Sequence, residues 1–116
     1  MVRLESLKKS NQFRKVLKEK KIHTDYFSIF AANSFIKPMH KANLLISFVM
    51  KKKIGNAVKR NKIRRKLKAI VQKLFKKRGA INKDYPYIVF GKSNAYAQKH
   101  DVLLLLMEKS FSKLKK

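Results

Sequence analysis

The feature that most constrains this chain is the stretch formed by residues 51–70, KKKIGNAVKRNKIRRKLKAI, in which ten residues are Lys or Arg and none is acidic. An apolar stripe begins inside it with spacings typical of a helix face buried in a core. The members of the stripe are Ile63, Leu67, Ile70, Val71, Leu74 and Phe75. Asn56 is a suitable N-cap and Gly79 a suitable stop. The sequence therefore predicts an amphipathic helix with one buried side and a strongly cationic surface.

The cations are placed unfavourably for the helix itself. Lys59, Arg60 and Lys62 lie in or next to the first turn, where the macrodipole is positive and a cation costs up to about 1 kcal/mol. Arg60, Arg64 and Lys68 follow at intervals of four, where each like-charged pair costs roughly 0.2–0.5 kcal/mol. An ordinary solvated surface is the alternative, but mixed charges would solvate it without repulsion. A phosphate-rich partner explains the pattern better, because helix N–H groups and Arg side chains both bind phosphate oxygens.

The whole chain has the same imbalance, with 31 Lys and Arg against 6 Asp and Glu and a net charge of +25. A polyanionic partner would relieve the resulting self-repulsion. The length of 116 residues and the hydrophobic fraction of 45% predict a single folded domain over residues 1–116. The absence of cysteine excludes disulfides and Cys-based zinc sites. The His and acidic residues form no recognisable metal or catalytic motif, so we expect no catalytic residue on this chain.

Targeting and membrane signals are also missing from the sequence. Residues 1–20 lack the apolar segment of a signal peptide. The longest apolar runs, residues 44–46, 48–50 and 102–107, are far too short to span a bilayer. We therefore expect a soluble, cytoplasmic protein without a membrane partner.

The segments around the basic helix predict an α+β fold with helices packed on a sheet. Residues 11–20 predict a short first helix. Residues 22–31 and 44–50 predict strands, of which the second is apolar on both faces and hence central. Residues 85–90 predict another strand, and residues 95–114 a final helix, although their Leu run is also compatible with a buried strand. A loop is expected at residues 33–43.

Aromatic residues suggest a possible binding face in the strand of residues 22–31. Strand alternation places Tyr26, Ser28 and Phe30 on one face and the intervening residues on the other. Together with Phe13 of the first helix, the two aromatic side chains on this face could stack on unpaired bases. Ordinary core packing is an equally good interpretation, and the sequence leaves open which face is covered.

A family resemblance begins with KKIGNAVKRNKIRRKLK, residues 52–68, which closely resembles the signature of the bacterial ribonuclease P protein subunit. That signature has the pattern K-x-G-x-A-V-x-R-N-x-x-(K/R)-R. The matching residues are Lys53, Gly55, Ala57, Val58, Arg60, Asn61, Arg64 and Arg65, and Lys62 stands where the family usually has the second Arg of its short motif. The flanking segments LKKSNQFRKVLK and KDYPYIVFGK resemble the first helix of the family and the strand after its basic helix. The agreement in order and spacing extends over nearly the whole chain.

The resemblance implies a more definite fold. The family order is helix, three strands, helix, strand, helix, and it gives a four-stranded sheet. A short first strand is then expected within residues 20–25. The third and fourth strands are expected to be connected around the basic helix by a left-handed crossover, against the usual right-handed rule.

The resemblance also implies the function of an accessory protein in a ribonucleoprotein endoribonuclease. Its RNA subunit performs the cleavage that removes the 5′ leader of precursor tRNA, Mg²⁺ enters through that RNA, and the protein holds no cofactor. The residues expected to bind the RNA subunit are Lys53, Asn56, Lys59, Arg60, Asn61, Lys62, Arg64, Arg65 and Lys68. Those expected to bind the single-stranded leader, in a cleft between the first helix and the sheet, are Phe13, Leu17, Tyr26, Phe30, Lys51 and Lys52.

Two other classes stay open on the sequence alone. A ribosomal or other structural RNA-binding protein would have the same basic helix but no leader cleft. A DNA-binding regulator would use residues 54–69 as a recognition helix in the major groove. The strands on both sides of that helix disfavour a helix-turn-helix, and we expect no DNA partner.

Overall fold

The computed structural model describes residues 4–7, 10–32, 43–77, 81 and 85–114. Its elements in chain order are β1 (Leu4–Glu5), α1 (Ser10–Lys18), β2 (Lys20–His23), β3 (Phe27–Ala31), β4 (Leu44–Val49), the 3-10 helix η1 (Lys52–Ile54), α2 (Ala57–Lys76), β5 (Tyr87–Gly91), the 3-10 helix η2 (Ser93–Ala95) and α3 (His100–Leu114). The α+β class is thus confirmed, including a helix rather than a strand for the Leu-rich C-terminal segment. Almost all of the expected loop at residues 33–43 lies outside the described residues, and so does Gly79.

Within the described residues the strands form one five-stranded sheet in the order β1-β4-β5-β3-β2. β1 and β5 are parallel to β4, whereas β3 is antiparallel to both β5 and β2. The family resemblance predicted a four-stranded sheet and a helix as the first element of the chain. Both predictions are wrong, because the described residues form five strands and β1 precedes α1. The additional strand, β1, is only two residues long and has no periodicity of its own. It exists because Leu4 and Glu5 pair with Leu44 and Leu45.

β4 and β5 are neighbouring parallel strands connected through α2, so these elements form a β-α-β unit. β4 lies between β1 and β5, which agrees with the interior position expected from its apolar residues. The left-handedness of the crossover stays a prediction of the family resemblance.

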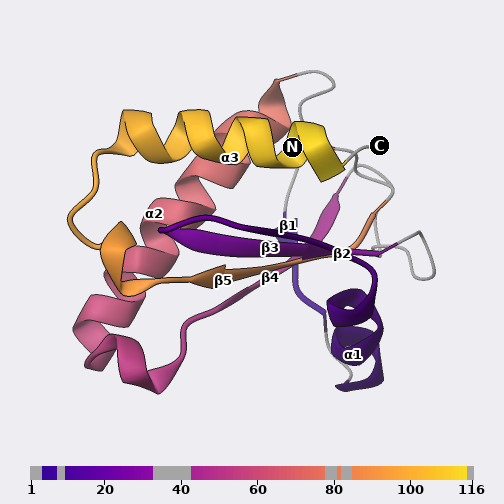
Figure 1. The fold of residues 1–116 in the computed structure, drawn as a ribbon, viewed down its shortest axis with the longest axis horizontal. Coiled ribbons are helices and arrows are strands. Elements are labelled where there is room, and N and C mark those ends of the chain that lie inside the picture. The colour runs from indigo at the N-terminus through magenta and orange to yellow at the C-terminus, as the bar shows by residue number, and fades with distance from the viewer. Residues whose placement is uncertain (1–3, 8–9, 33–42, 78–80, 82–84, 115–116) are drawn as a thin grey trace.

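Helices lie on both faces of the sheet, with α2 and α3 on one face and α1 on the other (Figure 1). The larger core joins α2 and α3 to side chains such as Phe27 and Ile29 of β3. The smaller core packs Val16 of α1 against Leu45 and Ile88. The apolar stripe of α2 is buried as expected, except that its last residue, Phe75, is half-buried. Among the helices of the described residues, none has both the length and the apolar character needed to cross a membrane.

The segment expected as one strand, residues 22–31, is a hairpin formed by β2 and β3. The Oγ1 atom of Thr24 closes the turn: it accepts hydrogen bonds from the N–H groups of Tyr26 and Phe27 at 3.2 and 3.1 Å and donates to the Phe27 carbonyl at 2.9 Å. A turn made by threonine lacks the Gly or Pro that usually marks a turn in a sequence. The short first strand implied by the resemblance is confirmed as β2.

The turn changes the position of Tyr26, for which the expected face was wrong. Within β3 the alternation holds, because Phe27 and Ile29 enter the larger core while Phe30 packs against the smaller one. Tyr26 precedes the strand and packs against the larger core, where its Oη accepts a hydrogen bond from Gln98 Nε2 at 2.7 Å. It therefore does not share a face with Phe30.

The connection between β4 and α2 needs one special backbone conformation. Gly55 has a φ of 153°, a region that side chains with a Cβ rarely adopt. Asn56 then caps α2 as expected, and its Oδ1 accepts a hydrogen bond from the Lys59 N–H at 2.9 Å. This geometry fixes where the cationic helix begins relative to the end of β4.

Candidate nucleic-acid interface

The residues expected to bind an RNA subunit lie on η1, at the N-cap of α2 and on α2 as far as Lys68. All of them are exposed or half-buried. None of them forms an ion pair with a carboxylate in the part of the chain that the structure describes. An ion pair at 2.7 Å joins Glu108 to Lys77, the residue that caps the C-terminal end of α2, and lies beyond this surface. The charge of this cationic surface therefore stays available for an external anion.

Some of these side chains are already oriented by neighbouring groups. Arg64 Nη1 donates a hydrogen bond to Asn61 Oδ1 at 2.8 Å, and Lys59 Nζ donates to Ser93 Oγ at 2.7 Å. The Nε atom of Arg60 is buried and lacks a hydrogen-bond partner among the described residues. Arg65 and Lys68 are exposed and project from the same helix. A guanidinium held as that of Arg64 is can donate to phosphate oxygens with little further loss of freedom.

The segment that follows β5 borders this surface through Tyr96. The ammonium groups of Lys62 and Lys59 lie 4.7 and 5.4 Å from the centre of the Tyr96 ring. Both distances are within the range of cation–π attraction. The Tyr96 ring thereby holds two of the cations close together at the N-terminal end of α2.

Lys66 has a structural role that the sequence did not reveal. Its Nζ donates to the carbonyl oxygens of Ala95, Tyr96 and Gln98 at 2.9, 2.9 and 2.7 Å. Burial, and then the nearby ammonium of Lys62, lower the pKa of Lys66 from its ordinary value of 10.5. Three carbonyl oxygens match the three donors of an ammonium group and offset part of the desolvation cost. Lys66 therefore ties α2 to the segment between β5 and α3.

This arrangement predicts that Lys66→Met destabilises the protein, because the apolar side chain leaves three carbonyl groups without their donor. We expect the free energy of unfolding to fall by about 1–3 kcal/mol. The control is Lys68→Met, which removes the same charge from an exposed position of the same helix and should change stability by less than about 0.5 kcal/mol. Urea denaturation followed by circular dichroism measures both. Equal stabilities of the two variants would contradict the structural role.

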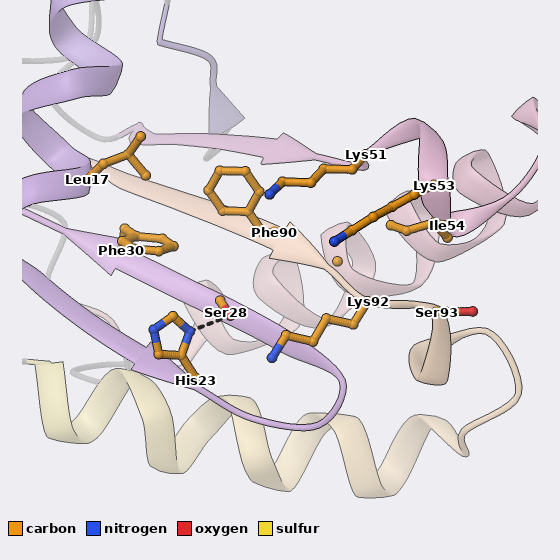
Figure 2. Close-up of a pocket in the computed structure, with 11 residues that line it drawn as sticks. Leu17, His23, Ser28, Phe30, Lys51, Lys53, Ile54, Phe90, Lys92 and Ser93 are labelled. Carbon is orange, nitrogen blue, oxygen red and sulfur yellow. Dashed lines mark hydrogen bonds between the residues drawn. The ribbon is translucent and has the colours of Figure 1, made fainter.

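A cleft lies on the α1 side of the sheet, near η1. It is a cavity of about 560 Å³ whose apolar walls include Leu17 from the end of α1, Phe30 from β3 and Phe90 from β5. Figure 2 shows the lysine side chains of the cleft reaching in from η1 and from the segments after β4 and β5. These cations are Lys51, Lys53 and Lys92. The cleft thus combines an aromatic wall with a rim of positive charge.

The aromatic wall has a defined geometry. The rings of Phe30 and Phe90 meet edge to face, with centres 5.4 Å apart and an interplanar angle of 79°. Lys51 Nζ lies 5.5 Å from the centre of the Phe90 ring. Lys92 Nζ donates to the Thr24 carbonyl at 2.6 Å, which holds this cation against the β2–β3 turn. Phe30 and Phe90 are half-buried, and accessible aromatic rings bordered by cations are typical of sites for single-stranded nucleic acid.

The structure brings together half of the residues expected to bind a leader. Three of them line the cleft: Leu17, Phe30 and Lys51. Phe13 packs against the smaller core beside Phe30 but is not part of the lining. Lys52 is exposed on η1 and is not part of the lining either, and Tyr26 belongs to the other face of the sheet. Lys53, expected on the surface that binds the RNA subunit, instead lines the cleft.

Sequence reasoning missed several residues of the cleft, namely His23, Ser28, Phe90 and Lys92. Phe90 alternates with Val89 in β5, a signal that could have placed it on one face. The choice of face depends on the pairing of β5 with β3 and β4.

Across the described residues, the His, Asp and Glu side chains form no group of three or more that could hold a metal ion.

The sheet is mixed, the cations of α2 lack carboxylate partners among the described residues, and the cleft combines an aromatic wall with a rim of lysines. Together these features define an α+β protein of the RNA-binding class. Comparison with known proteins identifies the family. The family model described as Ribonuclease P matches residues 1–115. The chain therefore belongs to the ribonuclease P protein family.

Individual relatives agree with this assignment. Over 82 residues the chain is 34% identical to the ribonuclease P protein component of Helicobacter acinonychis (strain Sheeba), in an alignment that covers 60% of this chain and 54% of that protein. The chain thus spans about half the length of the curated relative that it matches. The fold is similar to that of the RNase P protein of Thermotoga maritima, with a TM-score of 0.73 and 19% identity over 94% of this chain and 96% of the other. For the Staphylococcus aureus RNase P protein the TM-score is 0.65, with 22% identity over 96% and 94% of the two chains.

Proposed function

We propose that this chain is the protein subunit of ribonuclease P and assists a catalytic RNA subunit in removing the 5′ leader from precursor tRNA. The observation that carries the proposal is the presence of two different cationic features in a member of this family. One is the surface of α2, whose cations have no carboxylate partner among the described residues. The other is the lysine-rimmed cleft on the α1 side of the sheet.

The two features suit different forms of RNA. The α2 surface offers guanidinium groups to the phosphates of a folded RNA, which requires no access to base edges. The cleft offers Phe30 and Phe90 to bases that are unpaired, together with lysines for the adjoining phosphates. The α2 surface therefore binds the RNA subunit, and the cleft binds the single-stranded leader.

The chemistry of cleavage belongs to the RNA in this proposal. The chain contributes binding and orientation but no catalytic residue, and Mg²⁺ enters the holoenzyme through the RNA subunit. We place the assembly in the cytoplasm. A structural RNA-binding protein would have no need of the aromatic cleft, which favours the processing enzyme.

Reconstitution tests the proposed function. The purified chain alone should leave precursor tRNA intact, and at low Mg²⁺ it should raise the cleavage rate of a ribonuclease P RNA. Its affinity for that RNA should fall by about 10³-fold or more between 50 and 200 mM salt, because several phosphate contacts are involved. A chain that binds the RNA but leaves the cleavage rate unchanged at every Mg²⁺ concentration would contradict the proposal and favour a structural RNA-binding role.

A further inference from the structure

One side of the cleft carries a pair of polar side chains, His23 and Ser28, to which the proposed base stacking and phosphate binding assign no role. His23 at the end of β2 and Ser28 in β3 are directly opposite each other in the antiparallel register. His23 Nδ1 and Ser28 Oγ are 2.7 Å apart and hydrogen-bonded (Figure 2). Ser28 is only 5% exposed, whereas His23 is exposed. A buried hydroxyl thus holds an accessible imidazole within a cleft whose other walls are mostly apolar.

The imidazole is held in a fixed orientation. Its ring meets the ring of Phe30 edge to face, with centres 5.7 Å apart. The β2–β3 turn beneath it is closed by the hydrogen bonds of Thr24. With Nδ1 engaged by Ser28, the second ring nitrogen, Nε2, has no partner among the described residues. It is therefore a directional hydrogen-bonding group at a lining position of the cleft.

Stacking and phosphate binding, the interactions proposed above for the cleft, do not distinguish one base from another. Every base has a π-face that stacks on phenylalanine, and lysine ammonium groups bind phosphate regardless of sequence. A hydrogen bond to a base edge does discriminate, because bases differ in the donors and acceptors that they present. Since the Ser28 hydroxyl can donate or accept, Nε2 can present either a lone pair or a proton to that edge.

We propose that His23, positioned by Ser28, reads the edge of one unpaired base in the cleft and gives leader binding a base preference. This inference rests on the proposed function and deepens it, because the ligand is the same single-stranded leader. His23 is the specificity-determining contact, and Ser28 is a positioning residue. The preference concerns one nucleotide, because the pair occupies a single place beside Phe30.

The experiment uses the full chain assembled with a ribonuclease P RNA and a series of precursor tRNAs. Each substrate carries one of the four bases, or an abasic site, at one leader position, and the series is repeated along the leader. At one position the wild-type assembly should distinguish the best from the worst base by about 2- to 10-fold in affinity, the range of one net hydrogen bond. The same position should lose affinity when the base is removed.

His23→Phe keeps an aromatic ring but removes the hydrogen bond, so affinities for the four bases should become equal while the abasic substrate still binds more weakly. His23→Gln retains hydrogen-bonding groups in another geometry and should change the preferred base. Ser28→Ala should weaken the preference without removing the benefit of a base. Thermal melting of each variant confirms that it is folded.

An unchanged base ranking in His23→Phe would overturn the inference while leaving leader binding intact. A wild-type assembly that depends on leader length but shows no base preference at any position would overturn it as well. An affinity independent of both leader length and base would overturn the proposed leader cleft and this inference together.

Discussion

The variant Arg60→Ala/Arg64→Ala/Arg65→Ala should bind ribonuclease P RNA far more weakly than the wild-type chain and with a flatter salt dependence. Each lost phosphate contact should reduce the slope of log affinity against log salt by about one, so the triple variant should lose about three. The physical reason is that none of the three side chains has a carboxylate partner among the described residues. Filter binding between 50 and 200 mM salt, the range over which several contacts change affinity by about 10³-fold, measures the slope.

A matched control removes equal charge from elsewhere on the surface. Lys99, Lys109 and Lys113 are exposed on or next to α3, outside the cationic surface of α2. Their triple substitution by Ala should leave the slope nearly unchanged. Equal effects of the two triple variants would show that affinity follows net charge alone, and would contradict a specific α2 surface. The folded state of the Arg variant should persist, since the substitutions reduce repulsion and Ala favours helix.

The second large effect is expected in the cleft, from the variant Phe30→Leu/Phe90→Leu. Leucine retains apolar packing against the smaller core but removes the aromatic faces. Stacking contributes about 1–3 kcal/mol per base, so affinity for precursor tRNA should fall at least about tenfold. Affinity for the RNA subunit and for tRNA without a leader should stay within about twofold of wild type. Comparing substrates with and without a leader measures the effect.

Phe48→Leu provides the control for the cleft variant. Phe48 is in β4 and packs against the larger core, on the other side of the sheet from the cleft. This substitution makes the same chemical change in the same sheet and should leave leader affinity unaltered. A comparable loss of leader affinity in Phe48→Leu would indicate a general loss of structure rather than a loss of stacking.

The basic helix could be predicted from sequence because its determinants are local. The apolar stripe from Ile63 to Leu74 follows the helical period, and Asn56 needs only the adjacent backbone to act as a cap. The predicted first residues of α2 were therefore correct. Its cationic surface could also be predicted, since a high density of like charge in a helix is visible without knowledge of the packing.

The hairpin and β1 could not be predicted from the residue pattern, for different physical reasons. In the hairpin, the side chain of Thr24 closes the turn without Gly or Pro, so the residue pattern predicted a single strand over residues 22–31. Extending the alternation of β3 back to Tyr26 gave the wrong face for this residue. β1 depends on pairing with residues about forty positions away in the chain. Only tertiary contacts determine such a strand.

The existence of an aromatic, cationic cleft could be predicted, but only some of the residues that line it could be. Leu17 and Lys51 came from the family resemblance, and Phe30 from both the strand alternation and that resemblance. His23, Phe90 and Lys92 reach the cleft because β2, β3 and β5 are adjacent in the sheet. Their meeting depends on strand order, which no local period encodes. Lys66 was missed for a similar reason, since its carbonyl partners lie about thirty residues away.

β5 supplies side chains to both hydrophobic cores. Tyr87 and Val89 point into the larger core beneath α2 and α3, while Ile88 and Phe90 serve the opposite layer. Insertion or deletion of one residue here would reverse these assignments, because side chains alternate with a period of two. The length of this strand is therefore far less free to vary than its composition, and the cleft residues that it supplies, Phe90 and Gly91, can change by substitution rather than by insertion.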